Sequence, residues 1–463
     1  MKALLGVLTI VVFLGVLFTV PTAEASGALT ICALFSIPVI VVLLRNKIES
    51  EFLIRLFLAG LLIRIIVGTV INVLEMQGFF GPDALTYDFY GSALVKAWAG
   101  DPYFTSAINT YFGGLGATGW GWVYMVGAIY RVIGRNMLAI QFTNAAIGAA
   151  TAPTIFFIAY RLFKNRRVAR TAGLFVAFFP SLILWSSQGL KDAPIVFLLA
   201  LAILLTLKLT EKFNVINALS LCLVLASIIS FRFYIFFMIT VAVVGAFIIG
   251  TGKLTPTTFI RQLLVVACIG TALTYMGVLR LAQQQAGFFG DLRIIEASRA
   301  DLSQRAVSGF GRDFDVSTPE GAISVVPLGV VYLLFAPFPW EIRNLRQSIT
   351  LPEMLIWWAC FPLLILGLWF TIRYRLRQAF VILIFTTMLT LAYSIFQGNV
   401  GTAYRQRAQL LVFYFIFVAV GYVLLREKRE EKKQPADAAP QHPEERPRDR
   451  RLPISVGSPA KAN

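Results

Sequence analysis

Residues 138–160 read LAIQFTNAAIGAATAPTIFFIAY, and residues 161–167 read RLFKNRR. The first stretch carries no charge and is long enough to cross a bilayer as a helix, which takes roughly 20 residues. The second stretch is basic, and a basic loop after an apolar run is typical of the cytoplasmic side of a membrane. The pair predicts a transmembrane helix that runs inward to the cytoplasm.

The same pattern recurs along the chain. Hydrophobic residues make up 58% of the 463 residues and charged residues only 14%, whereas a soluble domain carries about 25% charged residues. These features predict an all-α polytopic membrane protein, a bundle of about 12 transmembrane helices. The expected spans are residues 4–20, 27–44, 52–74, 138–160, 172–186, 193–207, 216–230, 234–249, 263–279, 355–371, 380–396 and 410–425.

The net charge of +17 does not indicate nucleic-acid binding. The basic residues cluster in short runs between apolar spans, at 45–47, 161–170, 373–377 and 426–433. This is the positive-inside distribution of a membrane protein. We therefore expect membrane lipids and no nucleic acid among the partners.

Alternation of the spans predicts the domain organisation, with both termini in the cytoplasm. Residues 1–425 form one transmembrane domain with two large exoplasmic loops, about 75–136 and 281–353. Residues 426–463 are charged, proline-rich and free of aromatic residues, which predicts a disordered cytoplasmic tail.

Three segments leave alternatives open. Residues 119–133 are interpreted as a helix at the membrane interface, with a full span as the alternative. Residues 325–338 contain three prolines, which favours a short or re-entrant element. The first span precedes Ala23-Glu24-Ala25-Ser26, which resembles a signal-peptide cleavage site, although the length of the apolar stretch favours an uncleaved helix.

Cysteine and histidine usage narrows the chemistry. The four cysteines lie in apolar segments without metal-ligand spacing, and the single histidine, His442, lies in the polar tail. We interpret the cysteines as buried thiols. Catalysis by histidine and zinc ligation are therefore not expected within the membrane domain.

The first candidate site follows the third span, where residues 81–90 read GPDALTYDFY. Asp83 and Tyr87 are four residues apart and share one face of a helix. A carboxylate at a membrane surface is a reasonable general base, with Tyr87 and Asp88 as substrate-binding candidates. The alternative is that Asp83, after Pro82, only caps a helix.

Two further candidates lie on the same predicted side of the membrane. Lys191 and Asp192 stand at the mouth of a span, where Asp192 would either act in the site or cap the helix. Arg405 and Arg407 break the positive-inside trend, and the planar fork of arginine suits phosphate. Their alternative role is to anchor the helix at the interface.

Arg64 lies near the middle of the third span, where a charge is costly and by default indicates function. A buried pairing that only holds helices together is the competing interpretation. Residues 282–319 alternate arginines with acidic residues. This predicts either a folded, salt-bridged loop or a lid over a phosphate or sugar.

Taken together, these residues resemble the GT-C class of membrane glycosyltransferases, in its bacterial branch similar to protein O-mannosyltransferases and aminoarabinose transferases. The resemblance lies in Arg64 with residues 82–87, in residues 169–173, 179–181 and 190–194, and in residues 401–407. It covers about residues 52–425. The first loop carries one acidic residue at the key position, where many members have an Asp-Glu pair.

The resemblance implies a GT-C-like fold and an inverting transfer of a sugar from a polyprenyl-phosphate-linked donor to a glycan, lipid or protein acceptor. Asp83 would orient or deprotonate the acceptor, and Asp192 would assist it or orient Lys191. Lys191, Arg405 and Arg407 would stabilise the departing lipid phosphate. No cofactor is certain, although Asp83 and Asp192 could share a divalent metal ion. The site would face outward from a bacterial plasma membrane and serve the cell envelope.

Two rival functions remain. An O-antigen or exopolysaccharide polymerase has a similar number of spans and would rely on the loop arginines. A flippase for lipid-linked sugars would place its ionisable groups nearer the midplane.

Overall fold

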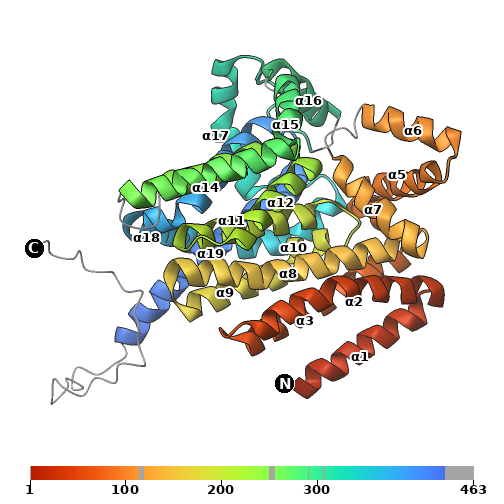
Figure 1. The fold of residues 1–463 in the computed structure, drawn as a ribbon, viewed down its shortest axis with the longest axis horizontal. Coiled ribbons are helices and arrows are strands. Elements are labelled where there is room, and N and C mark those ends of the chain that lie inside the picture. Colours follow the sequence, from red (N-terminus) through yellow and green to blue (C-terminus); the bar gives the residue numbers. More distant parts are fainter. Residues whose placement is uncertain (1, 114–118, 250–255, 290, 306–307, 433–463) are drawn as a thin grey trace, which may run out of the picture.

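The computed structural model describes residues 2–113, 119–249, 256–289, 291–305 and 308–432, and these fold into an all-helical bundle. Figure 1 shows long, roughly parallel helices with a group of shorter helices at one end of the bundle. The predicted fold class, an all-α polytopic membrane protein, is confirmed. Residues 433–463, which make up most of the predicted tail, lie outside the described residues.

The N-terminal helices form one side of the bundle, and shorter helices follow them in the region predicted as the first exoplasmic loop (Figure 1). The former are α1 (Lys2–Thr19), α2 (Thr22–Arg45) and α3 (Ser50–Val73). The latter are α4 (Gln77–Phe80), α5 (Asp83–Trp98), α6 (Pro102–Gly113) and α7 (Trp120–Ile133). At 14 residues, α7 is about 21 Å long, which is short of a bilayer core.

The middle of the chain supplies most of the bundle and the second group of short helices. Its longer helices are α8 (Met137–Phe163), α9 (Arg166–Phe178), α11 (Asp192–Glu211), α12 (Val215–Phe231), α13 (Phe233–Ile249) and α14 (Pro256–Tyr275), with the short α10 (Pro180–Ser186). The second group comprises α15 (Val278–Phe289), α16 (Leu292–Arg305), α17 (Pro319–Phe335) and the 3-10 helix η2 (Pro339–Glu341). The chain ends in α18 (Leu345–Phe396) and α19 (Val400–Lys432).

Among the described helices, six are long and apolar enough to cross a membrane, and the bent pair of α9 and α10 would make a seventh. Five more apolar helices are shorter. The twelve predicted spans fall on these helices, although the span predicted at 263–279 runs past the end of α14 at Tyr275. Three larger differences concern other spans. Two spans join in the 52-residue α18, whose backbone leaves the helical conformation at Arg375. The last helix continues to Lys432, beyond the predicted end at residue 425.

The third difference concerns the span predicted at 172–186, which is two helices bent by 54°. Pro180 has no amide hydrogen and clashes with a helical conformation of the residue before it. Phe179 is accordingly extended, with φ −69° and ψ 127°. Because of the break, backbone carbonyls at the end of α9 lack the amide donors that a continuous helix would supply.

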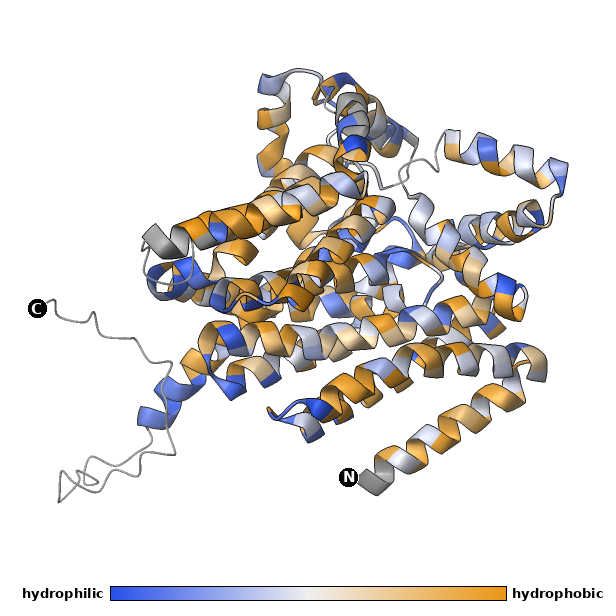
Figure 2. Ribbon diagram, in the orientation of Figure 1, coloured by the Kyte–Doolittle hydropathy of each residue, from blue (hydrophilic) through white to orange (hydrophobic). Residues whose placement is uncertain are grey.

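The most deeply buried helices are α8, α11 and α19, whereas α2 exposes most of its apolar surface. Figure 2 shows hydrophobic residues along the long helices and hydrophilic residues concentrated at their ends. This distribution is that of a multi-pass membrane protein. The 24-residue α3 is about 36 Å long and separates the turn at residues 46–49 from the helices α4 and α5.

Candidate active site

Arg405, on the first turns of α19, lies between two carboxylates from distant parts of the chain. It donates from Nη1 to Asp83 Oδ2 at 2.7 Å, and from Nε and Nη2 to Asp192 Oδ2 at 2.7 and 2.6 Å. The Arg405 side chain is 14% exposed, that of Asp192 is 1% exposed, and that of Asp83 is 52% exposed. One guanidinium therefore joins a buried carboxylate to an accessible one.

Arg232 completes this group and is absent from the sequence prediction. It lies between α12 and α13, is buried, and donates from Nη2 to Asp192 Oδ1 at 3.2 Å. Its Nη1 contacts the hydroxyl of Tyr393 at 3.4 Å, and that hydroxyl donates to Gln409 Oε1 at 2.7 Å. Asp192 thus accepts from an arginine on each oxygen and holds two cations side by side.

Neither acidic residue caps its helix. Asp83 and Asp192 each occupy the first helical position, after Pro82 and Lys191, and neither helix has a side-chain cap hydrogen bond. The capping alternative is therefore wrong for both residues. Their carboxylates bind arginine instead, so the helix starts serve to place charge in the site.

The loop before α11 carries Lys191 and is fixed by α8. Asn144 donates to the backbone carbonyls of Gln188 and Leu190 at 2.6 and 2.7 Å. The Lys191 ammonium lies 5.8 Å from the ring centroid of the buried Tyr87. Burial, together with the nearby Arg232, lowers the pKa of Lys191 to about 8. Lys191 and Tyr87 therefore lie beside the arginine–carboxylate group, as predicted for one shared site.

A cavity of about 790 Å³ opens over this group, with Asp83, Arg232 and Arg405 in its lining. The α4–α5 turn, the N-terminal turns of α18 and the start of α19 form its walls. The segment after α16 closes another side, where Phe310 N donates to Gly398 O at 2.8 Å and Ser308 Oγ donates to Asn399 Oδ1 at 2.8 Å. The cavity is large enough for a drug-sized ligand, since ligand sites typically measure about 300–1,000 Å³.

Three residues predicted for the site lie apart from it, and Arg407 is the first. It is buried and donates from Nη1 to the carbonyls of Leu334 and Ala336 at 3.0 and 3.1 Å. These carbonyls stand at the end of α17. Arg405 and Arg407 thus point in different directions from one helix, and only Arg405 reaches the cavity.

Asp88 and Arg64 are the other two. Asp88 accepts from Tyr130 at 2.7 Å and pairs with Arg135, which joins α5 to the end of α7. Arg64 donates to Ser186 Oγ at 2.7 Å and to the carbonyls of Ala177 and Val176 at 2.8 and 3.3 Å. It therefore satisfies the carbonyls left at the bend between α9 and α10.

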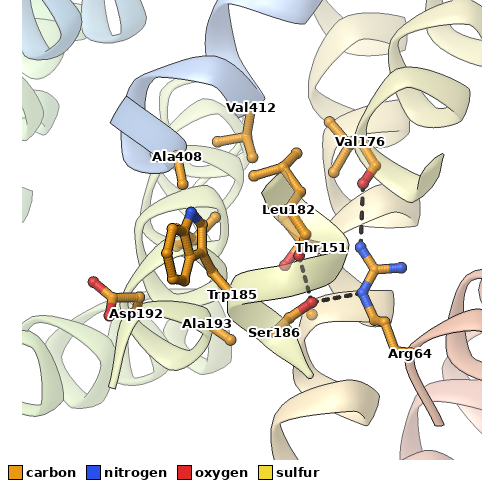
Figure 3. A pocket seen from close by; sticks show the side chains of 12 residues that line it. Arg64, Thr151, Val176, Leu182, Trp185, Ser186, Asp192, Ala193, Ala408 and Val412 are labelled. Atoms are coloured by element: carbon orange, nitrogen blue, oxygen red, sulfur yellow. Dashed lines mark hydrogen bonds between the residues drawn. The ribbon is translucent and has the colours of Figure 1, made fainter. Parts of the chain in front are cut away.

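Figure 3 shows the contacts of Arg64 with Ser186 and Val176 in a small internal pocket, where Arg64 and Ser186 lie on one side of Trp185 and Asp192 on the other. Arg64 thus lies behind the site. Its contacts agree with the competing interpretation, in which it holds helices together.

Two arginines of the segment 282–319 bind backbone carbonyls of the same segment. Arg299 donates to the carbonyl of Gly311 at 2.9 Å, and Arg312 donates to the carbonyl of Ser303 at 3.0 Å. Glu296 accepts from the backbone of Val316 at 2.8 Å. Leu302 and Ser308 from this segment line the cavity, so it serves as a wall.

The donor set does not fit a divalent metal ion in this arrangement. Among the described residues no group of three or more metal-binding side chains converges. Asp83 and Asp192, the pair considered for a shared ion, both bind the Arg405 guanidinium. A metal ion would have to displace that cation.

Residues 121–276 match the profile of a family described as dolichyl-phosphate-mannose-protein mannosyltransferase. No curated protein sequence matches the chain. Among solved structures, one match is the archaeal oligosaccharyltransferase AglB from Archaeoglobus fulgidus in complex with an inhibitory peptide and a dolichol-phosphate. The two are 12% identical with a TM-score of 0.41 over 68% of this chain, and the match spans only 43% of AglB.

The family match covers less than half of the chain but contains Lys191, Asp192 and Arg232. It confirms that this chain resembles the GT-C class of membrane glycosyltransferases.

Proposed function

We propose that this protein transfers a sugar from a polyprenyl-phosphate-linked donor to a glycan, lipid or protein acceptor at the exoplasmic face of a bacterial plasma membrane. Both termini would lie in the cytoplasm. The observation that carries the proposal is Arg405, held between the buried Asp192 and the accessible Asp83 in the lining of a large cavity. The group combines a base and a phosphate-binding cation in one place.

The cations are arranged for a phosphate. Arg405 uses one N–H on each nitrogen for the carboxylates, and a guanidinium carries five N–H donors. One N–H on each terminal nitrogen therefore remains for a ligand. With Arg232 and Lys191 beside it, the group carries three cations against two carboxylates. Its excess positive charge favours an anionic leaving group.

The transfer would proceed by inversion at the anomeric carbon. An acceptor hydroxyl or amine attacks that carbon and gives its proton to Asp83, the more exposed carboxylate. The bond between the anomeric carbon and the phosphate oxygen breaks, and its electron pair leaves with the polyprenyl phosphate. Arg405 then stabilises charge that develops during the reaction, where preorganised donors contribute most. Asp192 acts as a positioning residue for Arg405 and Arg232.

The rival functions receive less support. A polymerase would rely on arginines of the segment 282–319, but Arg299 and Arg312 bind backbone carbonyls there. A flippase would use ionisable groups near the midplane, but Arg64 is committed to carbonyls at a helix bend.

The test separates binding from transfer in protein reconstituted in nanodiscs. Undecaprenyl phosphate is titrated into wild type, Arg405→Gln, Asp83→Asn and, as a charge-matched control, Arg131→Gln, whose arginine is exposed on α7. We expect saturable binding that weakens at least about tenfold only in Arg405→Gln, because a lost charged pair costs upward of about 1.4 kcal/mol.

Transfer of labelled sugar from the lipid-linked pool of source membranes should fall by about 10²–10⁴-fold in Asp83→Asn, the usual contribution of a general base. Binding should persist in that variant. Absence of binding in folded wild type would contradict the proposal that the donor is linked to a polyprenyl phosphate. Unchanged transfer in Asp83→Asn would remove the assigned base.

A further inference from the structure

A second cavity of about 790 Å³ lies among α1, α3 and α9, at the end of the bundle opposite Asp83. The separation follows from the length of α3, which has Glu49 before its first turn and leads to Asp83 after its last. Figure 1 shows α1, α3 and α9 side by side on the outer part of the bundle. We call this cavity the basal groove.

The walls of the basal groove change from charged to apolar along one direction. On α9 the lining residues are Arg166, Arg170, Leu174 and Phe178, which recur every fourth residue and therefore form one stripe. On α3 the charged lining residues Glu51 and Arg55, with Phe52 between them, precede Leu56 and Ala59. In Figure 2 the hydrophilic ends of α3 and α9 lie at the same end of the bundle.

The charged end has a fixed arrangement with an excess of cations. Glu49 is 7% exposed and accepts from Arg170 Nε at 2.6 Å, with Arg166 Nε at 3.7 Å. The Arg170 guanidinium also lies 5.3 Å from the ring centroid of Phe52. The lining contains four cations and two carboxylates, since Lys47 and Arg55 join the two arginines and Glu51 joins Glu49.

The apolar end is exposed at the surface of the bundle. Leu174 is 43% and Phe178 41% exposed, and Leu8 of α1, which faces them across the groove, is 43% exposed. A groove with an excess of cations at the membrane surface and apolar walls below it matches an amphiphile with an anionic head. Basic pockets between transmembrane helices bind anionic lipid head groups for this reason.

We propose that the basal groove binds one anionic glycerophospholipid, with its phosphate on Arg166 and Arg170 and an acyl chain along Leu174, Phe178 and Ala59. The apolar half of the groove argues for a lipid over a free phosphate, because a free phosphate would leave that half without a partner. The site is separate from the cavity over Arg405, and its occupancy does not depend on the proposed transfer.

The test is native mass spectrometry of the full-length protein, released from nanodiscs that contain phosphatidylglycerol in phosphatidylcholine. The head-group variant is Arg166→Gln with Arg170→Gln, and the chain variant is Ala59→Trp, which fills the apolar half and keeps every charge. The control is Arg373→Gln with Arg377→Gln, which removes two exposed arginines near the kink of α18, outside the groove.

We expect one retained phosphatidylglycerol in wild type and control. Retention should fall about tenfold in the head-group variant and about as much in Ala59→Trp, with folding checked by thermal melting. Equal retention in groove and control variants would overturn the site. Displacement of the lipid by millimolar inorganic phosphate would show a free-anion site and overturn the lipid assignment, as would retention unchanged in Ala59→Trp.

Discussion

The two ends of the bundle use the same residue types in opposite arrangements. At the end with the large outer cavity, one largely buried arginine, Arg405, is shared by two carboxylates, one of them 52% exposed. At the basal groove, one buried carboxylate, Glu49, is shared by two arginines that are 68% and 51% exposed. The accessible member of the first group is an anion, and the accessible members of the second are cations.

This difference decides what each end can do. An accessible carboxylate fixed beside cations can take a proton from an incoming group while the cations bind its partner anion. Accessible cations around a buried carboxylate can only attract and hold an anion. Chemistry is therefore expected at the first end and binding alone at the second.

The largest expected effect that separates the two ends is on stability. Asp192→Asn removes the carboxylate that pairs with the buried Arg232 and leaves Arg405 paired with Asp83 alone, and loss of one partner from a buried pair costs about 3–5 kcal/mol. Glu49→Gln is the matched change at the other end, where the arginines stay hydrated and the cost is about 0–1 kcal/mol. Denaturant unfolding in detergent measures both. Equal losses would contradict the assigned difference in burial.

A smaller effect concerns pH and the first end. The pKa of Lys191 is lowered to about 8 by burial and by Arg232, so the side chain is a cation at pH 7 and loses its proton as pH rises through 8. If it assists phosphate binding, affinity for undecaprenyl phosphate should fall by up to about tenfold from pH 7 to pH 9. Titrations at several pH values give the profile.

The control for this profile is Lys191→Arg, which stays charged throughout this range and should bind equally at pH 7 and pH 9. The phosphate has its second pKa near 6 and becomes only slightly more negative above pH 7, so it does not contribute to the fall. An affinity of wild type that does not change with pH, or the same fall in Lys191→Arg, would show that Lys191 does not contribute to phosphate binding.

The sequence predicted which residues lie at the first end better than it predicted their individual contacts. Alternation of spans placed Asp83, Asp192 and Arg405 on one side, and the structure brings them together through one guanidinium. Arg407 could not be separated from Arg405 by that argument, because sidedness does not specify helix face. Side chains two positions apart on a helix differ by about 200° in direction. Arg405 and Arg407 therefore reach different neighbours.

Arg232 could have been predicted from the sequence by its charge and its place in the chain. It is the single charge between two apolar runs, in a turn that alternation places on the same side as Arg405, so it breaks the positive-inside trend in the same way. Pro180 also indicates the bend after Phe179, but the sequence does not show how the freed carbonyls are satisfied. Only packing reveals that the carbonyls freed there are satisfied by Arg64 from another helix.

The smallest effect tests the exposure of the second end directly. A double-mutant cycle of Glu49→Gln and Arg170→Gln should give a coupling of about 0.5 kcal/mol at low salt. At 1 M salt the screening length is about 3 Å, so this coupling should largely vanish. The cycle of Asp192→Asn and Arg232→Gln should keep its larger coupling, because buried pairs are screened much less. If both cycles lost the same fraction, Arg170 of the basal groove would be no more accessible than Arg232, and it could not receive a lipid phosphate.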